Sequence, residues 1–136
     1  MDVAVFTVGA INEEALSLNL GQLEAGEVEA LLRDAVGDAC SRFFTRDGAV
    51  AAPAVEARTV GIRLEELRAR PVRVLVAGGR VKASALDTAL RMGFATHLVV
   101  DQDLAAALLE RQGEASPSVG GQRRPPTDEN TCQFSR

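Results

Sequence analysis

The sequence predicts an α/β domain built on parallel strands, on the strength of two observations. The first is a strand–helix–strand pattern over residues 72–109, in which two apolar runs flank an amphipathic segment. Two strands joined by such a helix are expected to be parallel neighbours with a right-handed crossover. The second is composition: 46% of the 136 residues are hydrophobic, yet Trp and Tyr are absent and only five Phe occur. A core of Leu, Val and Ala is typical of a parallel sheet covered by helices.

The strand–helix–strand unit is the clearest part of the chain. Residues 72–77 form its first predicted strand, Gly78-Gly79 a tight turn, residues 82–92 the helix and residues 97–100 the second strand. Asp101 follows as the expected N-cap of a further helix. Ligands of such sheets bind at the carboxyl ends of the strands. The Gly-Gly turn lies at that edge and is therefore a candidate binding site.

The remaining elements are less regular. Buried strands are predicted at residues 3–9 and 36–44, a weaker extended stretch at 49–57, and helices at 27–32 and 64–68. From Gln112 onward the chain is polar and rich in Pro and Gly, which predicts a disordered tail. The expected organisation is one domain over residues 1–111 and a tail over residues 112–136. A chain that opens within a core strand also suggests that another segment once preceded it.

Composition narrows the classes of function. The formal net charge is −4 and no basic block exceeds Arg123-Arg124, so direct nucleic-acid binding by this chain is not expected. No apolar run has the roughly 18–20 residues of a membrane span, and the N-terminus lacks a signal-peptide pattern. Cys40 and Cys132 are far apart and the chain has one His, so no metal centre and no cofactor is expected. The predicted location is the reducing cytoplasm.

Lys82 is the one lysine among 15 basic residues, and it follows the Gly-Gly turn where a strand passes into a helix. Backbone N–H groups at such a junction bind anions, whereas a lysine there opposes the helix macrodipole. This mismatch predicts a phosphate or carboxylate near Lys82, Gly78 and Gly79. The alternative is an exposed lysine that extends into water beside an ordinary turn. Gly-Gly-x-x-Lys is too short for a dinucleotide fingerprint or a P-loop.

Other polar residues offer weaker candidates. Asp38 could bond a sugar hydroxyl, although an Asp after glycine is often a turn or capping residue. Arg42 and Arg46 could reach an anion. His97 opens a strand with no evident Ser or Cys partner, and Cys40 is interpreted as a buried, inert thiol. No set of nucleophile, base and orienting group emerges, so no catalytic residue is predicted and the pattern argues against an enzyme.

Several motifs in order along the chain resemble the sugar-binding domain of SorC/DeoR-type bacterial transcriptional regulators. Residues 35–48 resemble that family's "AVGDI-x-G-x-F-F-D-x-x-G" stretch, and residues 60–67 its short helix before a strand. Residues 76–82 resemble "VAGG-x-x-K", residues 89–93 "ALRGG", and residues 97–101 with Ala105 "VLVTD-x-x-TA". The match covers about residues 2–110. Ser41 and Thr45 depart from the family's Gly and Asp.

The resemblance implies a Rossmann-like α/β domain, related to sugar-phosphate isomerase and CoA-transferase folds, whose parallel sheet is incomplete here. Such a domain binds a phosphorylated sugar and thereby changes how a regulator oligomer holds its operator. By position, Lys82 would meet the anionic group of the effector beside Gly78 and Gly79, and Asp38 would lie near the sugar. The departures at Ser41 and Thr45 bear on the geometry of that sugar side.

A complete regulator of this kind begins with a helix-turn-helix and the front half of the effector domain, whose Gly/Thr-rich loop supplies much of the phosphate site. The chain matches only the later part, so it is expected to be a truncated form. It is expected to bind no DNA directly, because DNA contact needs the helix-turn-helix that it lacks. The exposed half-sheet predicts self-association or aggregation. Two alternatives stay open: a sugar-phosphate isomerase-like enzyme using Asp38 or His97, and a remnant or oligomerisation module that binds nothing.

Overall fold

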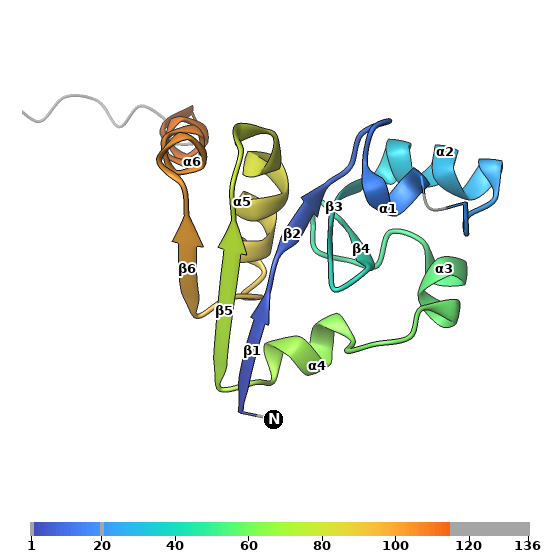
Figure 1. Ribbon diagram of the computed structural model, residues 1–136, viewed down its shortest axis with the longest axis horizontal. Helices are drawn as coiled ribbons and strands as arrows, with labels where there is room; N and C mark the ends of the chain where they lie inside the picture. Colours follow the sequence, from blue (N-terminus) through green and yellow to red (C-terminus); the bar gives the residue numbers. More distant parts are fainter. Residues whose placement is uncertain (1, 20, 115–136) are drawn as a thin grey trace, which may run out of the picture.

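The segment that the sequence predicts as one buried strand, residues 3–9, is divided in two at Thr7. In a computed structural model that describes residues 2–19 and 21–114, β1 (Val3–Phe6) and β2 (Val8–Ala10) belong to different sheets. β1 pairs in parallel with β5 (Val72–Ala77), whereas β2 pairs antiparallel with β3 (Ala35–Ala39). Figure 1 shows this N-terminal segment running from one sheet into the other. The single-strand prediction is therefore wrong, because the chain changes partners at Thr7.

The parallel sheet has the order β1-β5-β6, with β6 at His97–Val100. A short 3₁₀ helix, η1 (Arg80–Lys82), and α5 (Ala83–Arg91) connect β5 to β6, and α6 (Gln102–Glu114) follows β6. β5 and β6 are parallel neighbours, which confirms the predicted strand–helix–strand unit. α6 continues to Glu114, beyond the predicted domain boundary at residue 111. Most of the predicted tail lies outside the described residues.

The predicted strand over residues 36–44 is a hairpin instead. β3 pairs antiparallel with β4 (Arg42–Thr45) around a two-residue turn, Cys40-Ser41, in which φ is +54° and +63°. A turn with both central residues at positive φ matches the twist of the two strands, and Asn-Gly is its usual sequence. Cys-Ser carries no such signal, so the sequence conceals this turn. Together β2, β3 and β4 form a second, antiparallel sheet that the sequence did not predict.

The predicted extended stretch over residues 49–57 is also wrong, because α3 (Pro53–Arg58) occupies its second half. Pro53 stands in the first helical turn, where proline's fixed φ fits and its missing N–H leaves no helical bond unmade. The predicted helices are confirmed as α2 (Ala25–Asp34) and α4 (Leu64–Arg68). α1 (Leu16–Asn19) is a further short helix.

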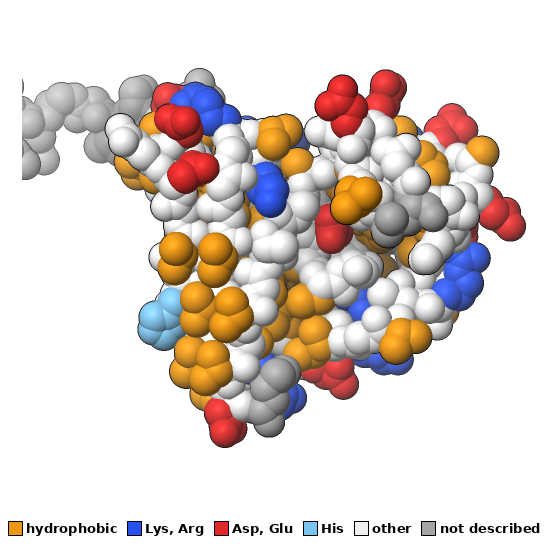
Figure 2. Space-filling model, viewed as in Figure 1, with side chains coloured by type: hydrophobic (Ala, Val, Ile, Leu, Met, Phe, Trp, Pro, Cys, Tyr) orange, Lys and Arg blue, Asp and Glu red, His pale blue; other side chains and the backbone are white. Residues whose placement is uncertain are grey.

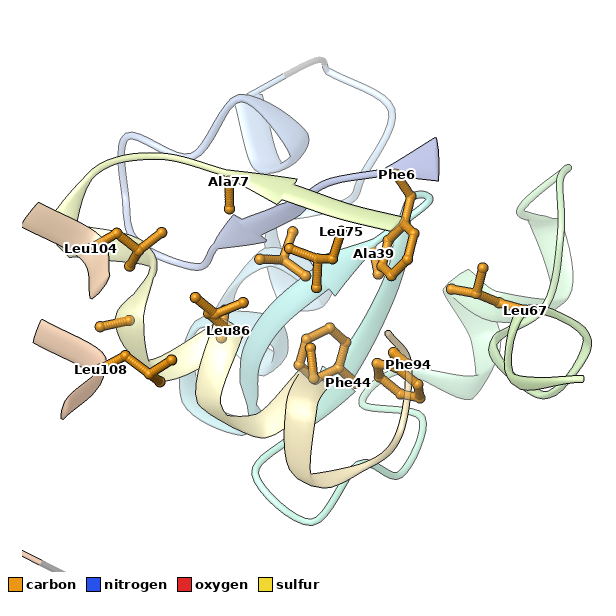
Figure 3. Packing of buried hydrophobic residues seen from close by; sticks show 14 of the residues in the cluster. Phe6, Ala39, Phe44, Leu67, Leu75, Ala77, Leu86, Phe94, Leu104 and Leu108 are labelled. Atoms are coloured by element: carbon orange, nitrogen blue, oxygen red, sulfur yellow. The ribbon is translucent and has the colours of Figure 1, made fainter. Parts of the chain in front are cut away.

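The main core lies between the parallel sheet, α5 and α6, and it extends onto the hairpin (Figure 3). Leu86 of α5 is fully buried, and Phe94 is nearly so. Phe94 packs edge-to-face on Phe44 of β4, with ring centroids 5.5 Å apart. Aromatic and aliphatic side chains of both sheets therefore share one cluster.

Gly37 sets how closely the hairpin approaches α5. A Cβ at residue 37 would lie 2.5 Å from the Cβ of Ala85 and 3.0 Å from the ring of Phe44. Real Cβ contacts are longer than this, so any larger residue would push β3 away from α5. The bare backbone at Gly37 thus places the next residue, Asp38, beside the beginning of α5.

We expect Ser41→Gly to stabilise the fold by about 1 kcal/mol, because a side chain in the left-handed region costs roughly 1–2 kcal/mol that glycine avoids. Urea unfolding of the chain and the variant measures the change. Ser84→Gly is the matched control within α5, where glycine is expected to destabilise by about 0.5–1 kcal/mol. A destabilising effect of similar size at both positions would contradict a left-handed turn at Ser41.

Candidate functional site

The Gly-Gly turn lies at the carboxyl end of β5, as predicted. Gly79 has a φ of +90°, a conformation that side-chain-bearing residues rarely adopt. A Cβ on Gly78 would lie 2.8 Å from the Oδ2 of Asp101. Both residues therefore need to be glycine: Gly79 because of its positive φ, and Gly78 because the Asp101 carboxylate lies where a side chain would be.

Asp101 ties this turn to the next helix. Its Oδ2 accepts a hydrogen bond from the Gly79 N–H at 2.8 Å, and its Oδ1 accepts one from the Leu104 N–H at 2.7 Å. The N–H groups of Leu104 and Gly79 hold the pKa of this carboxyl below its usual value. The predicted N-cap is confirmed, whereas the bond to Gly79 was missed. The Gly79 amide that was predicted to face an anion thus already donates to a carboxylate.

Asp38 lies on β3 directly opposite Gly9 of β2. Its carboxylate covers the Gly9 backbone, because a Cβ on Gly9 would lie 2.1 Å from the Asp38 Oδ1. Gly9 was not among the site residues predicted from the sequence. The signal that could have found it is its position as a glycine at the end of an apolar run. The absence of a side chain at Gly9 therefore makes the space that the Asp38 carboxylate occupies.

Asp38 and Lys82 come together from separate parts of the chain. Burial raises the pKa of the Asp38 carboxyl, and the positive charge of Lys82 partly offsets this. Within residues 2–19 and 21–114, no hydrogen bond or salt bridge is formed by either side chain. The structure thus brings a half-buried, unpaired carboxylate within range of an unpaired ammonium group, beside the Gly-Gly turn.

Arg42 has a structural role. It is 3% exposed, and its guanidinium donates to the carbonyl oxygens of Glu56, Gly61 and Ile62 at 2.9, 2.8 and 3.2 Å. It also forms a salt bridge of 3.0 Å with the Glu56 carboxylate. Arg42 therefore fastens the segment between α3 and α4 to β4, and it is not placed to reach an anion in solution.

The other candidates lie apart from the Asp38–Lys82 pair or serve local structure. His97 is exposed on β6, with its Nδ1 2.9 Å from the Thr96 Oγ1, and Arg46 is exposed after β4. Cys40 is half-buried in the hairpin turn, where burial raises the pKa of its thiol. Cys132 lies outside the described residues. No cluster of three or more His, Cys, Asp or Glu able to hold a metal ion occurs in the described part of the chain.

A cleft of about 400 Å³ opens elsewhere, between the hairpin turn and the helices α1 and α3. Its lining includes Leu23, Phe43 and Val55 with Ser17 and Arg58, and it includes none of the four predicted site residues. The Arg58 guanidinium is already paired with Glu27 at 2.9 Å. The unpaired charges of the described residues at the sheet edge therefore make the stronger candidate site.

Among the described helices, none has the length and apolar character needed to cross a bilayer.

The model of the sugar-binding domain family, Sugar-bind, matches residues 1–110. The chain belongs to this family. The sugar-binding domain is 42% identical over 108 residues to the deoxyribonucleoside regulator of Bacillus subtilis, covering 79% of this chain and 34% of that protein. The resemblance to SorC/DeoR-type transcriptional regulators is thereby confirmed.

Two solved structures show the same fold. A transcriptional regulator from Streptococcus pneumoniae TIGR4 superimposes with a TM-score of 0.76 at 30% identity, covering 83% of this chain and 44% of that one. A DeoR family transcriptional regulator from Listeria monocytogenes superimposes with a TM-score of 0.73 at 32% identity. The match covers 79% of this chain and 44% of that one. The sugar-binding domain described here thus spans about a third of its curated relative and less than half of either solved chain.

We expect Asp38→Asn to stabilise the fold by about 1 kcal/mol at neutral pH, because it removes an unpaired, partly buried charge. A raised pKa in the folded state means that stability falls as pH rises from the ordinary value of 3.8 through the folded-state value. The gain from the variant is therefore absent near pH 3, where the carboxyl is protonated, and grows as pH increases. Urea unfolding of both chains between pH 3 and 8 measures it.

The matched control is Asp47→Asn, which makes the same chemical change at an exposed residue. Its effect is expected to be small and independent of pH. If the stability change caused by Asp38→Asn is as independent of pH as that of the control, or if the variant is less stable above pH 5, then Asp38 has a favourable partner and this description of the site is wrong.

Proposed function

We propose that this domain binds a phosphorylated sugar as the effector module of a transcriptional regulator. Lys82 binds the phosphate, Asp38 accepts hydrogen bonds from sugar hydroxyls, and the bare backbone of Gly79, next to Gly78, lets the ligand approach. The observation that carries the proposal is the unpaired Asp38 carboxylate beside an unpaired Lys82. A desolvated charge without a partner lowers stability, which indicates that the missing partner is a ligand.

The chemistry of the pair favours this class of ligand. A carboxylate is an acceptor only, so it suits hydroxyl groups, whereas an ammonium group donates three hydrogen bonds and suits an anion. Lys82 opens α5, whose N-terminal N–H groups add to the attraction for a phosphate. Because Gly79 already donates to Asp101, the phosphate contact depends on Lys82 more than on the turn amides.

The proposal covers the whole regulator by analogy with its relatives, which are named as transcriptional regulators. The effector would change how a homo-oligomer of the regulator holds its operator, with DNA contacted by a part outside this domain, in the cytoplasm. The net charge of −4 agrees with a domain that does not itself bind DNA. No described observation favours the isomerase-like alternative, since His97 is bonded to its neighbour Thr96 and lies on the sheet face away from the core.

We expect the domain to bind one member of a panel of pentose and hexose phosphates in a thermal-shift scan, and not the unphosphorylated partner sugar. Ligand at 100 times the dissociation constant stabilises by about 2.7 kcal/mol, which raises the melting temperature visibly. Lys82→Ala is expected to weaken binding by about 10- to 100-fold, because a hydrogen bond to a charged group contributes about 1.5–3 kcal/mol.

Arg46→Ala is the control, since it removes an equal charge from an exposed position after β4. Equal loss in both variants would mean that only net charge matters and that Lys82 does not contact the phosphate. A cooperative transition that no sugar phosphate moves would favour the remnant or oligomerisation alternative.

A further inference from the structure

Both backbone polar groups of Gly79 are hydrogen-bonded. Its N–H donates to the Asp101 Oδ2 at 2.8 Å, and its carbonyl oxygen accepts a bond from the Lys82 N–H at 3.1 Å. Gly79 immediately precedes η1, and Lys82 is the last residue of η1. The Asp101 carboxylate, which lies between β6 and α6, is therefore linked to the backbone of Lys82 through one intervening residue.

The Asp101 carboxylate is itself fixed in place. Its Oδ1 accepts a hydrogen bond from the Leu104 N–H of α6 at 2.7 Å, while its Oδ2 is bonded to Gly79. A carboxylate that is bonded through both oxygens cannot rotate without breaking one of the two bonds. The conformation of the turn, with the φ of Gly79 at +90°, is thus held relative to the beginning of α6.

A second contact joins η1 to α6. Arg80 forms a salt bridge of 2.7 Å with Glu110, and its guanidinium donates to the carbonyl oxygen of Asp103 at 3.5 Å. Figure 2 shows basic and acidic side chains close together over α6. The side chains of Arg80 and Glu110 are each more than half exposed, and such pairs contribute little to stability. The Asp101 carboxylate is therefore the stronger of the two polar links between η1 and α6.

We propose that Asp101 is a positioning residue of the phosphate site, which acts through Gly79 and holds Lys82 where its ammonium group meets the phosphate. The inference rests on the proposed function, and it adds a residue that does not itself touch the ligand. Lys82 is half-buried, so the position of its backbone limits where its ammonium group can lie. A group that is already in place binds more tightly, because less conformational entropy is lost on binding.

The charge of Asp101 separates positioning from simple electrostatics, because the two have opposite effects on phosphate affinity. A carboxylate near a bound phosphate repels it, so removal of that charge alone would strengthen phosphate binding. Loss of the bond to Gly79 would free the turn and Lys82, and would weaken phosphate binding. A variant of Asp101 that binds phosphate less tightly would therefore show that its positioning effect outweighs the repulsion.

The test is a titration of the full chain with inorganic phosphate at constant ionic strength, followed through the ¹H–¹⁵N amide signals of Gly79 and Lys82. Asp101→Ser is the main variant, because serine caps a helix about as well as aspartate but has a single oxygen, which the Leu104 N–H occupies. We expect phosphate binding to weaken roughly tenfold. Hydrogen exchange of the Gly79 amide is expected to become faster, while that of Leu104 stays unchanged.

Asp103→Ser is the matched control. It removes the same charge from the first turn of α6, and the Asp103 side chain forms no hydrogen bond or salt bridge with any described residue. We expect its phosphate affinity to equal that of the unaltered chain or to rise slightly. Circular dichroism melting curves check that each variant folds, and Asp101→Asn replaces Asp101→Ser if that variant does not.

Phosphate affinity that Asp101→Ser leaves unchanged or raises would overturn the inference and leave the proposed function in place. Equal weakening by Asp101→Ser and Asp103→Ser would also overturn it, because the effect would then belong to α6 as a whole. The absence of saturable phosphate binding to the unaltered chain would overturn it as well, and the scan of sugar phosphates then decides the proposed function separately.

Discussion

At Gly37 the hairpin packs against α5 without a side chain between them. A Cβ at residue 37 would lie only 2.5 Å from the Cβ of Ala85, so β3 and α5 can come this close only because residue 37 is glycine. Everything in the candidate site depends on it, because Asp38 is the next residue of the hairpin and Lys82 immediately precedes α5. A larger residue at position 37 would separate the two charges and open the shared core around Phe44 and Phe94.

Two aspartates at this edge of the molecule have opposite electrostatic environments. Two backbone N–H groups hold the pKa of Asp101 below its usual value, so its charge is fully used in fixing the Gly-Gly turn and the beginning of α6. Burial raises the pKa of Asp38, and the positive charge of Lys82 partly offsets this rise. Asp101 therefore stabilises the fold as an anion, whereas Asp38 lowers stability as an anion. An aspartate thus has a structural role at position 101, whereas under the proposed function the aspartate at position 38 binds a ligand.

The sequence predicted the elements that follow periodic rules and missed those set by tertiary contacts. The strand–helix–strand unit over β5, α5 and β6 came from apolar runs and a regular helical face. The hairpin was missed because Cys40-Ser41 takes a left-handed turn without glycine, and the division at Thr7 leaves no mark in a continuous apolar run. Lys82 and Asp38 were both named as candidates, but their proximity depends on Gly37, whose role no local pattern reveals.

Lys82 is the one charge that faces the unpaired Asp38 carboxylate in the described part of the chain. A ¹³C NMR titration of the Asp38 carboxyl group, in the chain and in Lys82→Ala, measures the effect of that charge. We expect a titration midpoint above the ordinary value of 3.8, and a further rise when Lys82 is removed. A midpoint at or below 3.8, or one that Lys82→Ala leaves in place, would contradict it.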